Sequence, residues 1–158
     1  MYRTLAVLSV VAVGATAVYA QNLDAIKARR EAMQAIATAG SANFGMMQGK
    51  VPFDLATVQA NLKMYQEQAA KFKGLFPEDS KTGGNTDAKP KIWQSKAEFD
   101  AANDNFITVV KAAAAAITDE ASLKTEYPKV ISQGCNGCHK DADGFSPPLR
   151  ESFKKPKS

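Results

Sequence analysis

The sequence predicts an all-α protein, an antiparallel up-down-up-down four-helix bundle, and four observations support this fold class. Four stretches repeat apolar or small residues at alternating spacings of three and four, the period of one helix face. Stretches that contain glycine and proline separate them. No stretch alternates with a period of two, so no sheet is expected. Two of the three connections are short, and short connections join antiparallel neighbours.

A turn sequence divides the first two predicted helices. The inward seam of the first helix runs through Leu23, Ile26, Arg30, Met33, Ala37, Gly40, Phe44 and Met47, and that of the second through Leu55, Val58, Leu62, Tyr65, Ala69 and Phe72. Between them, Gly49 and Pro52 interrupt the helical pattern. Asp54 is a suitable N-cap for the second helix, because its carboxylate can accept hydrogen bonds from the first backbone N–H groups.

A long connection over residues 74–90, which contains Pro77, Gly83 and Gly84, leads to the last two predicted helices. The third seam runs through Ile92, Lys96, Phe99, Asn103, Phe106, Val110, Ala113 and Ile117, and the fourth through Leu123, Tyr127, Val130 and Gly134. Thr118 and Asp119 mark the expected start of the fourth helix. Pro128 lacks a backbone N–H, so we expect it to kink this helix or to start a second segment.

Residues 1–20 have the layout of a cleaved signal peptide. A basic start at Arg3 precedes an apolar run from Leu5 to Val13, and a small residue, Ala20, stands at the expected cleavage point. The run is shorter than the roughly 20 apolar residues of a membrane-spanning helix. We therefore predict export, a helical domain over residues 21–145, an irregular tail over residues 146–158 and no stable membrane insertion after cleavage.

The charge distribution does not indicate a nucleic-acid-binding protein. The chain has 20 lysines and arginines against 16 acidic residues, a net charge of +4. The basic residues are scattered, apart from a cluster at Lys154, Lys155 and Lys157. No basic stripe of the kind that follows a phosphate backbone is present, and the basic tail is interpreted as a solvated chain end.

The most specific motif is Cys135-Asn136-Gly137-Cys138-His139, the C-x-x-C-H pattern of covalent haem c attachment. Two thiols form thioethers with the two vinyl groups on one edge of the porphyrin, and the following imidazole reaches the iron. On a helix, positions i, i+3 and i+4 share a face, so Cys135, Cys138 and His139 can point the same way. The motif predicts one covalent haem c per chain.

Three other uses of the two cysteines are weaker. A structural zinc site needs four ligands, usually in two pairs, and the sequence has no second pair. A thioredoxin-like redox pair normally belongs to a βαβ unit, which a helical chain lacks. A disulfide between Cys135 and Cys138, the ordinary expectation in an exported chain, would leave His139 unexplained.

The sixth iron ligand is a separate question. His139 is the only histidine, which excludes a second histidine ligand from the same chain. Methionine is the usual alternative in electron-transfer cytochromes, and the candidates are Met33, Met46, Met47 and Met64. Met33 lies about 15 Å from the start of the first helix, near the expected end of the fourth, whereas Met46 and Met47 lie about 35 Å along. The competing interpretation of Met33 is an ordinary core methionine.

The sequence resembles the class II cytochromes c, the cytochrome c′ family, and most closely their low-spin, methionine-ligated cytochrome c-556 branch. The motifs that carry the resemblance are Arg29-x-x-x-Met33, Gly49-Lys50-Val51-Pro52-Phe53-Asp54, Leu75-Phe76-Pro77, Ala88-Lys89-Pro90-Lys91-Ile92-Trp93 and the C-x-x-C-H pentapeptide.

The resemblance implies a periplasmic four-helix haem protein in which His139 is the proximal ligand, Met33 the distal ligand and Arg29 a neighbour of the haem propionates. A solvated surface charge is the alternative for Arg29. The chain departs from the family where an aromatic residue and an arginine usually follow the histidine, since it has Ala142 and Asp143. Arg150 is a candidate to replace that missing arginine, although nothing in the spacing requires it.

The predicted function is that of a periplasmic one-electron carrier with His/Met-ligated haem iron, which transforms no substrate and is therefore not an enzyme. Its expected partners are periplasmic redox proteins, and the resemblance leaves a homodimer open. The alternative is a five-coordinate haem protein that binds or senses NO or CO. Met33 discriminates between the two, because a bound thioether blocks the distal face of the iron.

Overall fold

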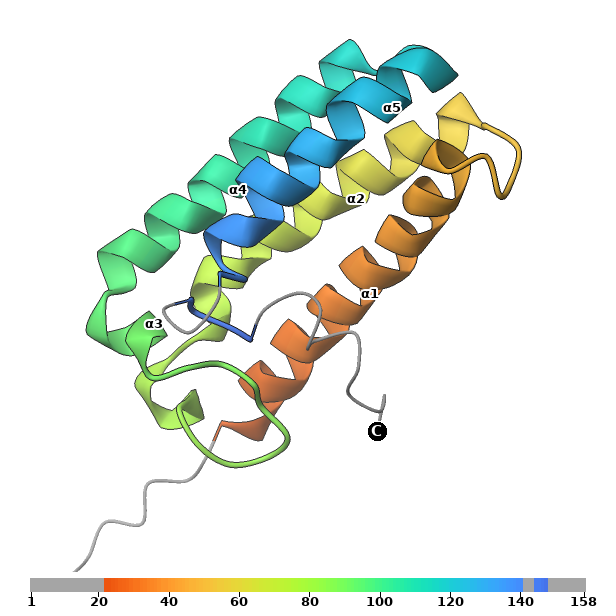
Figure 1. Cartoon of the computed structure of the whole chain (residues 1–158). Helices are drawn as coiled ribbons and strands as arrows, with labels where there is room; N and C mark the ends of the chain where they lie inside the picture. The colour runs from red at the N-terminus through yellow and green to blue at the C-terminus, as the bar shows by residue number, and fades with distance from the viewer. Residues whose placement is uncertain (1–21, 141–143, 148–158) are drawn as a thin grey trace, which may run out of the picture.

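The computed structural model describes residues 22–140 and 144–147, so the predicted signal peptide and most of the predicted tail lie outside the described residues (Figure 1). Four long helices alternate in direction: α1 (Leu23–Met47), α2 (Leu55–Phe72), α4 (Lys96–Ala116) and α5 (Glu120–Lys129). The described part of the chain contains no strand. None of its helices combines the length and apolar character needed to cross a membrane. The predicted antiparallel four-helix bundle is confirmed.

Side-chain caps explain where three of these helices begin. The Asn22 side chain accepts a hydrogen bond from the Ala25 N–H (3.0 Å), and Asp54 accepts one from the Ala56 N–H (3.1 Å). Asp119 accepts from the Ser122 N–H (2.7 Å), while the Ser122 hydroxyl accepts from the Asp119 N–H (3.0 Å). These bonds pair backbone donors that the first helical turn leaves without partners. The predicted cap at Asp54 is present, and Asp119 caps α5 where the fourth helix was expected to start.

The third predicted helix is two helices. A short α3 (Lys91–Gln94) ends at Ser95, whose backbone (φ −128°, ψ 53°) is not helical, and α4 starts at the next residue. The seam residues Ile92 and Phe99 are buried on either side of the break, so the apolar period continues across it. Two short turns, η1 (Lys73–Leu75) and η2 (Glu78–Ser80), lie in the preceding long connection.

The fourth helix changes its hydrogen-bond pattern soon after Pro128. α5 passes directly into a π-helical turn, η3 (Val130–Gly134), and then into a 3-10 turn, η4 (Cys135–Gly137). The Val130 N–H bonds to the Tyr127 carbonyl, and the Cys135 N–H bonds to the carbonyls of both Ile131 and Val130. Proline supplies no N–H to the preceding turn, so the regular ladder cannot continue through it unchanged. The expected second segment is therefore a widened turn that leads into Cys135.

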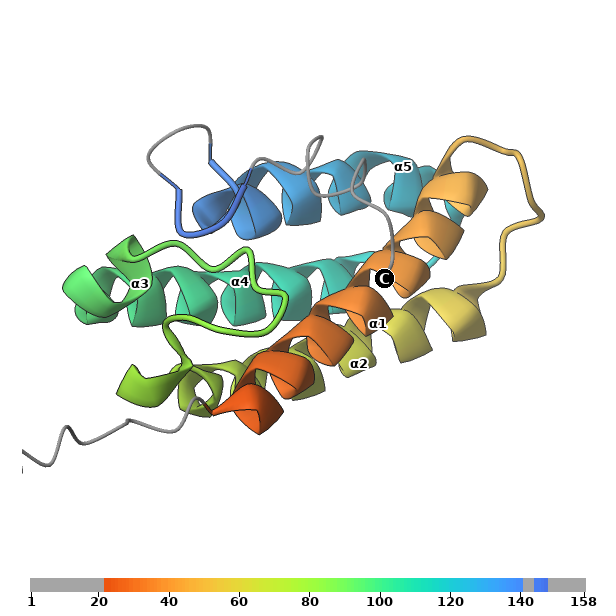
Figure 2. The ribbon, with the colours of Figure 1, turned by 90° about the horizontal axis from the view of Figure 1, so that it is seen from below.

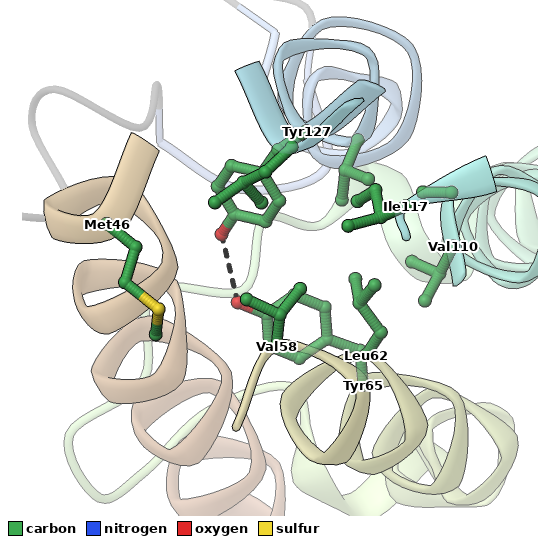
Figure 3. Packing of buried hydrophobic residues seen from close by; sticks show 10 residues of the cluster. Met46, Val58, Leu62, Tyr65, Val110, Ile117 and Tyr127 are labelled. Carbon is green, nitrogen blue, oxygen red and sulfur yellow. Dashed lines mark hydrogen bonds between the residues drawn. The ribbon is translucent and has the colours of Figure 1, made fainter. Parts of the chain in front are cut away.

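The buried apolar residues form two clusters. The larger one fills the bundle between α1, α2, α4 and α5 (Figure 3), and its buried members are Met46, Val58, Leu62, Tyr65, Val110, Ala113, Ile117, Leu123, Tyr127 and Val130. The smaller one, which we call the aromatic cluster, consists of Phe76, Ile92, Phe99 and Phe145, with Cys138 packed against it. The attachment motif therefore lies next to the aromatic cluster.

The predicted seam of α1 is partly wrong. Leu23 and Phe44, which it included, are 52% and 40% exposed. The buried residues of α1 are Ile26, Arg29, Ala32, Asn43 and Met46. Two of these are polar and are buried because other segments hydrogen-bond them, which apolar periodicity does not detect. Met33 is half-buried rather than fully inward.

Candidate haem site

The attachment motif occupies the last turns of the fourth helix. The backbone N–H of His139 donates to the Cys135 carbonyl (3.0 Å), and the Cys138 N–H donates to the same carbonyl (3.2 Å). His139 therefore lies one helical turn after Cys135, as predicted. Both cysteines are half-buried free thiols, so the structure does not contain the disulfide considered above.

The chemistry of the two thiols argues against a redox-active pair. Burial raises the pKa of Cys135 and of Cys138 to about 11. Both thiols are protonated at neutral pH, whereas the attacking cysteine of a dithiol oxidoreductase needs a lowered pKa. Among the described residues, no group of three or more histidines, cysteines and carboxylates could hold a metal ion, so a structural zinc site is not supported either.

The His139 ring is oriented by a backbone carbonyl. Its Nδ1 lies 2.8 Å from the Pro147 oxygen. A carbonyl oxygen only accepts hydrogen bonds, so Nδ1 carries the proton and Nε2 keeps its lone pair. Burial lowers the pKa of His139, although the bond to Pro147 acts in the opposite direction. A neutral imidazole with its second nitrogen held in this way is the usual form of a metal-ligating histidine.

Arg29 is a buried structural cation and not the solvated surface charge considered as its alternative. It is 4% exposed. Its guanidinium donates to the Ser80 hydroxyl (2.9 Å) and carbonyl (2.9 Å), to the Thr86 hydroxyl (2.7 Å) and to the Leu75 carbonyl (3.3 Å). It also lies over the Phe76 ring, 4.9 Å from its centroid. Arg29 thus fastens α1 to the connection between α2 and α3, while its contact with a haem propionate stays a prediction.

Three of the four candidate methionines pack in or against the larger core cluster. The Met46 sulfur accepts a hydrogen bond from the Asp54 N–H (3.4 Å), and Met46 is a buried member of that cluster. Met47 and Met64 are half-buried and pack against it. Met33 belongs to neither cluster.

The contact between α1 and α5 gives the level of Met33 in the bundle. The Tyr127 hydroxyl on α5 donates to the Gly40 carbonyl on α1 (3.4 Å). From this contact, Cys135 lies eight residues onward along the fourth helix and Met33 seven residues back along α1. Because the two helices are antiparallel and rise about 1.5 Å per residue, Met33 and Cys135 both lie about 11 Å from the contact, in the same direction. The ribbons of α1 and α5 diverge toward that end (Figure 2).

A buried polar group at the centre of the bundle has no signal in the sequence. Asn43 is fully buried, and its Oδ1 accepts a hydrogen bond from Asn61 Nδ2 (2.8 Å). Asn43 Nδ2 donates to no other atom of the described residues. The Tyr65 and Tyr127 hydroxyls lie 3.1 Å apart nearby. Both tyrosines lie on predicted seams because of their apolar rings, but nothing in the spacing indicates that their hydroxyls meet.

Comparison with known proteins identifies the family. The family model described as Cytochrome C′ matches residues 24–141. A cytochrome c′ of Rhodopseudomonas palustris is 43% identical over 133 residues, which cover 82% of this chain and 84% of that protein. The chain belongs to the cytochrome c′ family. A cytochrome c-556 of the same organism is 31% identical, over 89% of this chain and 96% of that protein.

Solved cytochrome c′ structures share the fold. The R. palustris cytochrome c′ structure superposes with a TM-score of 0.73 at 37% identity and covers 80% of this chain and 98% of that chain. A structural model of oxidised R. palustris cytochrome c-556 gives a TM-score of 0.68 at 27% identity, with coverages of 78% and 100%. Relatives of both kinds match, so membership of the c-556 branch stays a prediction.

Members of the cytochrome c′ family carry covalently bound haem c, and haem c is therefore the cofactor of this protein. The residues at the end of the fourth helix fit this group. Cys135 and Cys138 are not bonded to each other. His139, one turn beyond Cys135, has its Nδ1 on a carbonyl, so its Nε2 lone pair is available to a metal ion.

Proposed function

We propose that this cytochrome c′ family protein is an exported one-electron carrier whose haem c is attached through Cys135 and Cys138 and whose iron is bound by His139 and Met33. The observation that carries the proposal is the level of Met33. Counted from the contact between Tyr127 and Gly40, it lies at about the same level of the bundle as Cys135. Met46, Met47 and Met64, in contrast, pack in or against the larger core cluster.

When bound, haem c supplies a one-electron ferric/ferrous couple. The chain's own residues then determine how that couple behaves. His139 presents Nε2, since its Nδ1 is held by Pro147. The Met33 thioether would supply the second protein ligand to the iron and would raise the reduction potential. Arg29, one turn before Met33, is a buried cation that favours the ferrous state, because the ferric state carries one more positive charge.

The test is the absorption spectrum of the holoprotein, matured in a periplasm, in both oxidation states. Low-spin spectra with a thioether-to-iron charge-transfer band are expected, together with loss of that band in Met33→Ala. Met64→Ala is the matched control, and it should keep the band. A high-spin oxidised spectrum in the unmodified protein would contradict methionine ligation while leaving haem attachment intact.

A second candidate function is the binding of NO or CO at a five-coordinate iron. The observation that favours it is the set of cytochrome c′ relatives, since two solved structures of Alcaligenes xylosoxidans cytochrome c′ variants, 27% and 28% identical to this chain, hold NO. Titration of the reduced protein with CO separates the two functions. Fast, tight binding supports the gas-binding function, and binding limited by slow release of Met33 supports the electron carrier.

Location and partners belong to the same proposal. Export rests on residues 1–20, which lie outside the described residues, and the periplasm is the compartment that the family resemblance implies. Periplasmic redox proteins are the proposed partners, with no nucleic acid involved. Fractionation of cells that express the full chain, with spectroscopic detection of haem c in the periplasmic fraction, tests the location.

A further inference from the structure

The segment over residues 144–147, which we call the return loop, folds back tightly onto the attachment motif. The N–H groups of Phe145 and Ser146 both donate to the Cys138 carbonyl (3.0 and 3.2 Å). Gly144 is buried, and a Cβ at this position would lie 2.6 Å from the Lys140 oxygen and 2.9 Å from the Cys138 oxygen. Those neighbours are backbone atoms and cannot rotate away. Only glycine allows the loop to come this close.

Phe145 anchors the return loop to two further elements. Its ring is 6% exposed and packs edge-on against Phe99 of α4, with ring centroids 5.4 Å apart. Its carbonyl accepts a hydrogen bond from the Lys89 N–H (3.0 Å), just before α3. The loop is therefore held by Cys138, by the aromatic cluster and by the connection that precedes α3.

These anchors place the Pro147 carbonyl 2.8 Å from His139 Nδ1. A backbone carbonyl has no side-chain torsion of its own, so its position depends on the loop that carries it. Gly144 and Phe145 thus act on the imidazole through the path of the backbone.

We propose that the return loop is a positioning device for the proximal ligand, in which Gly144 and Phe145 hold the Pro147 carbonyl against His139 and so set the ring orientation and electron donation of that ligand. The proposal rests on the proposed role of His139 as iron ligand. A hydrogen bond from Nδ1–H to a carbonyl makes Nε2 more basic. A more basic ligand stabilises the ferric state, so the loop lowers the reduction potential.

The first test uses the unmodified holoprotein. In ¹⁵N-labelled reduced protein, the His139 Nδ1–H signal should be observable and should exchange slowly with water, because its proton is bound to a carbonyl. A Nδ1 proton that exchanges at the rate of an open imidazole would overturn the proposal without any need for a variant.

The second test moves the loop. Gly144→Ala should speed exchange of the Nδ1 proton and raise the reduction potential, with Gly74→Ala as the matched control, since a Cβ at Gly74 meets nothing within 4 Å. Loss of such a hydrogen bond to a ligating histidine typically changes metal affinity at least tenfold. A tenfold change in the ferric-to-ferrous ratio corresponds to 59 mV for one electron. Pro147→Ala keeps the carbonyl and should keep both the signal and the potential.

The outcomes separate the two proposals. If the His139 ring signals carry no shift from the haem, His139 is not the ligand and the proposed function fails. If those shifts are present but the Gly144→Ala protein matches the Gly74→Ala protein in proton exchange and potential, only the positioning role fails. A potential change without a change in Nδ1 exchange indicates altered haem exposure and also contradicts the positioning role.

Discussion

The hydroxyl of Tyr65 lies 3.1 Å from the hydroxyl of Tyr127, and this contact joins α2 to α5 inside the larger core cluster (Figure 3). Tyr127 also reaches the Gly40 carbonyl of α1. A Cβ at Gly40 would lie 3.2 Å from the Tyr65 hydroxyl oxygen, so the absence of a side chain there lets three helices meet. This group fixes the register of α1 against α5, on which the level of Met33 depends.

Removal of both hydroxyls of this pair should cost less than the sum of the two single removals. Tyr65→Phe or Tyr127→Phe leaves the other buried hydroxyl short of a partner, at a cost of about 1–3 kcal/mol. The double variant replaces both polar groups, and its cost should be smaller than the sum of the single costs. Denaturant unfolding of the holoproteins measures the free energies. Additive costs would show that the hydroxyls do not interact.

The same pair predicts a loss of stability at high pH. Burial is the largest cause that raises the pKa of both tyrosines above the ordinary value of about 10. Because the folded-state pKa of each tyrosine lies above its unfolded-state pKa, the two tyrosines contribute their full stabilisation below pH about 10. This contribution declines as the pH rises from the unfolded-state pKa to the folded-state pKa. The unfolding free energy should therefore fall above pH about 10. The Tyr65→Phe/Tyr127→Phe protein should show a smaller decline, and an equal decline would assign the effect to other groups.

Gly134, the residue before Cys135, should not tolerate a side chain. A Cβ there would lie 3.0 Å from Cδ2 of the Phe106 ring and 3.7 Å from a Val109 methyl carbon. Gly134→Ala should cost about 1–3 kcal/mol, because the ring must move within packed surroundings. Thermal unfolding compared with Gly74→Ala provides the measurement and its control. Equal melting temperatures would show that Phe106 moves aside freely.

Arg29→Lys should destabilise the protein although it conserves the charge. An ammonium group cannot reproduce the planar fork that reaches Ser80, Thr86 and the Leu75 carbonyl together. Loss of charge-assisted hydrogen bonds of this kind costs about 1.5–3 kcal/mol. Arg30→Lys makes the same change at the neighbouring position and should cost less. The prediction is wrong if the two variants unfold at the same denaturant concentration.

The helices and most of their buried faces could be predicted because their signals are local. The cap at Asp54 and the seams of α2, α4 and α5 follow from side-chain types at helical spacing. The break at Ser95 could not be predicted, because Ile92 and Phe99 keep the apolar period on both sides of it. The seam of α1 is partly wrong because Arg29 and Asn43 are buried through hydrogen bonds with other segments, which apolar spacing does not indicate.

The attachment motif could also be predicted from a short stretch of sequence, since the C-x-x-C-H pattern by itself indicates haem attachment. Its closest partner, the Pro147 carbonyl, could not be found in the same way, because every residue has a carbonyl and only the path of the backbone brings this one to His139. The contact depends in turn on Gly144, whose role is visible only when a Cβ is placed against the Lys140 and Cys138 backbone.

The π-helical turn η3 has a consequence for anyone who moves this haem site into another bundle. It accommodates one more residue than an α-helical turn would, directly before Cys135. In a regular α-helix an extra residue turns everything beyond it by about 100°, whereas the widened turn absorbs that residue. A graft onto an ideal helix must therefore either keep the π turn with all five residues of Val130–Gly134 or shorten this segment to four residues. Five residues in regular α-helical geometry would turn both cysteines by about 100° relative to Tyr127.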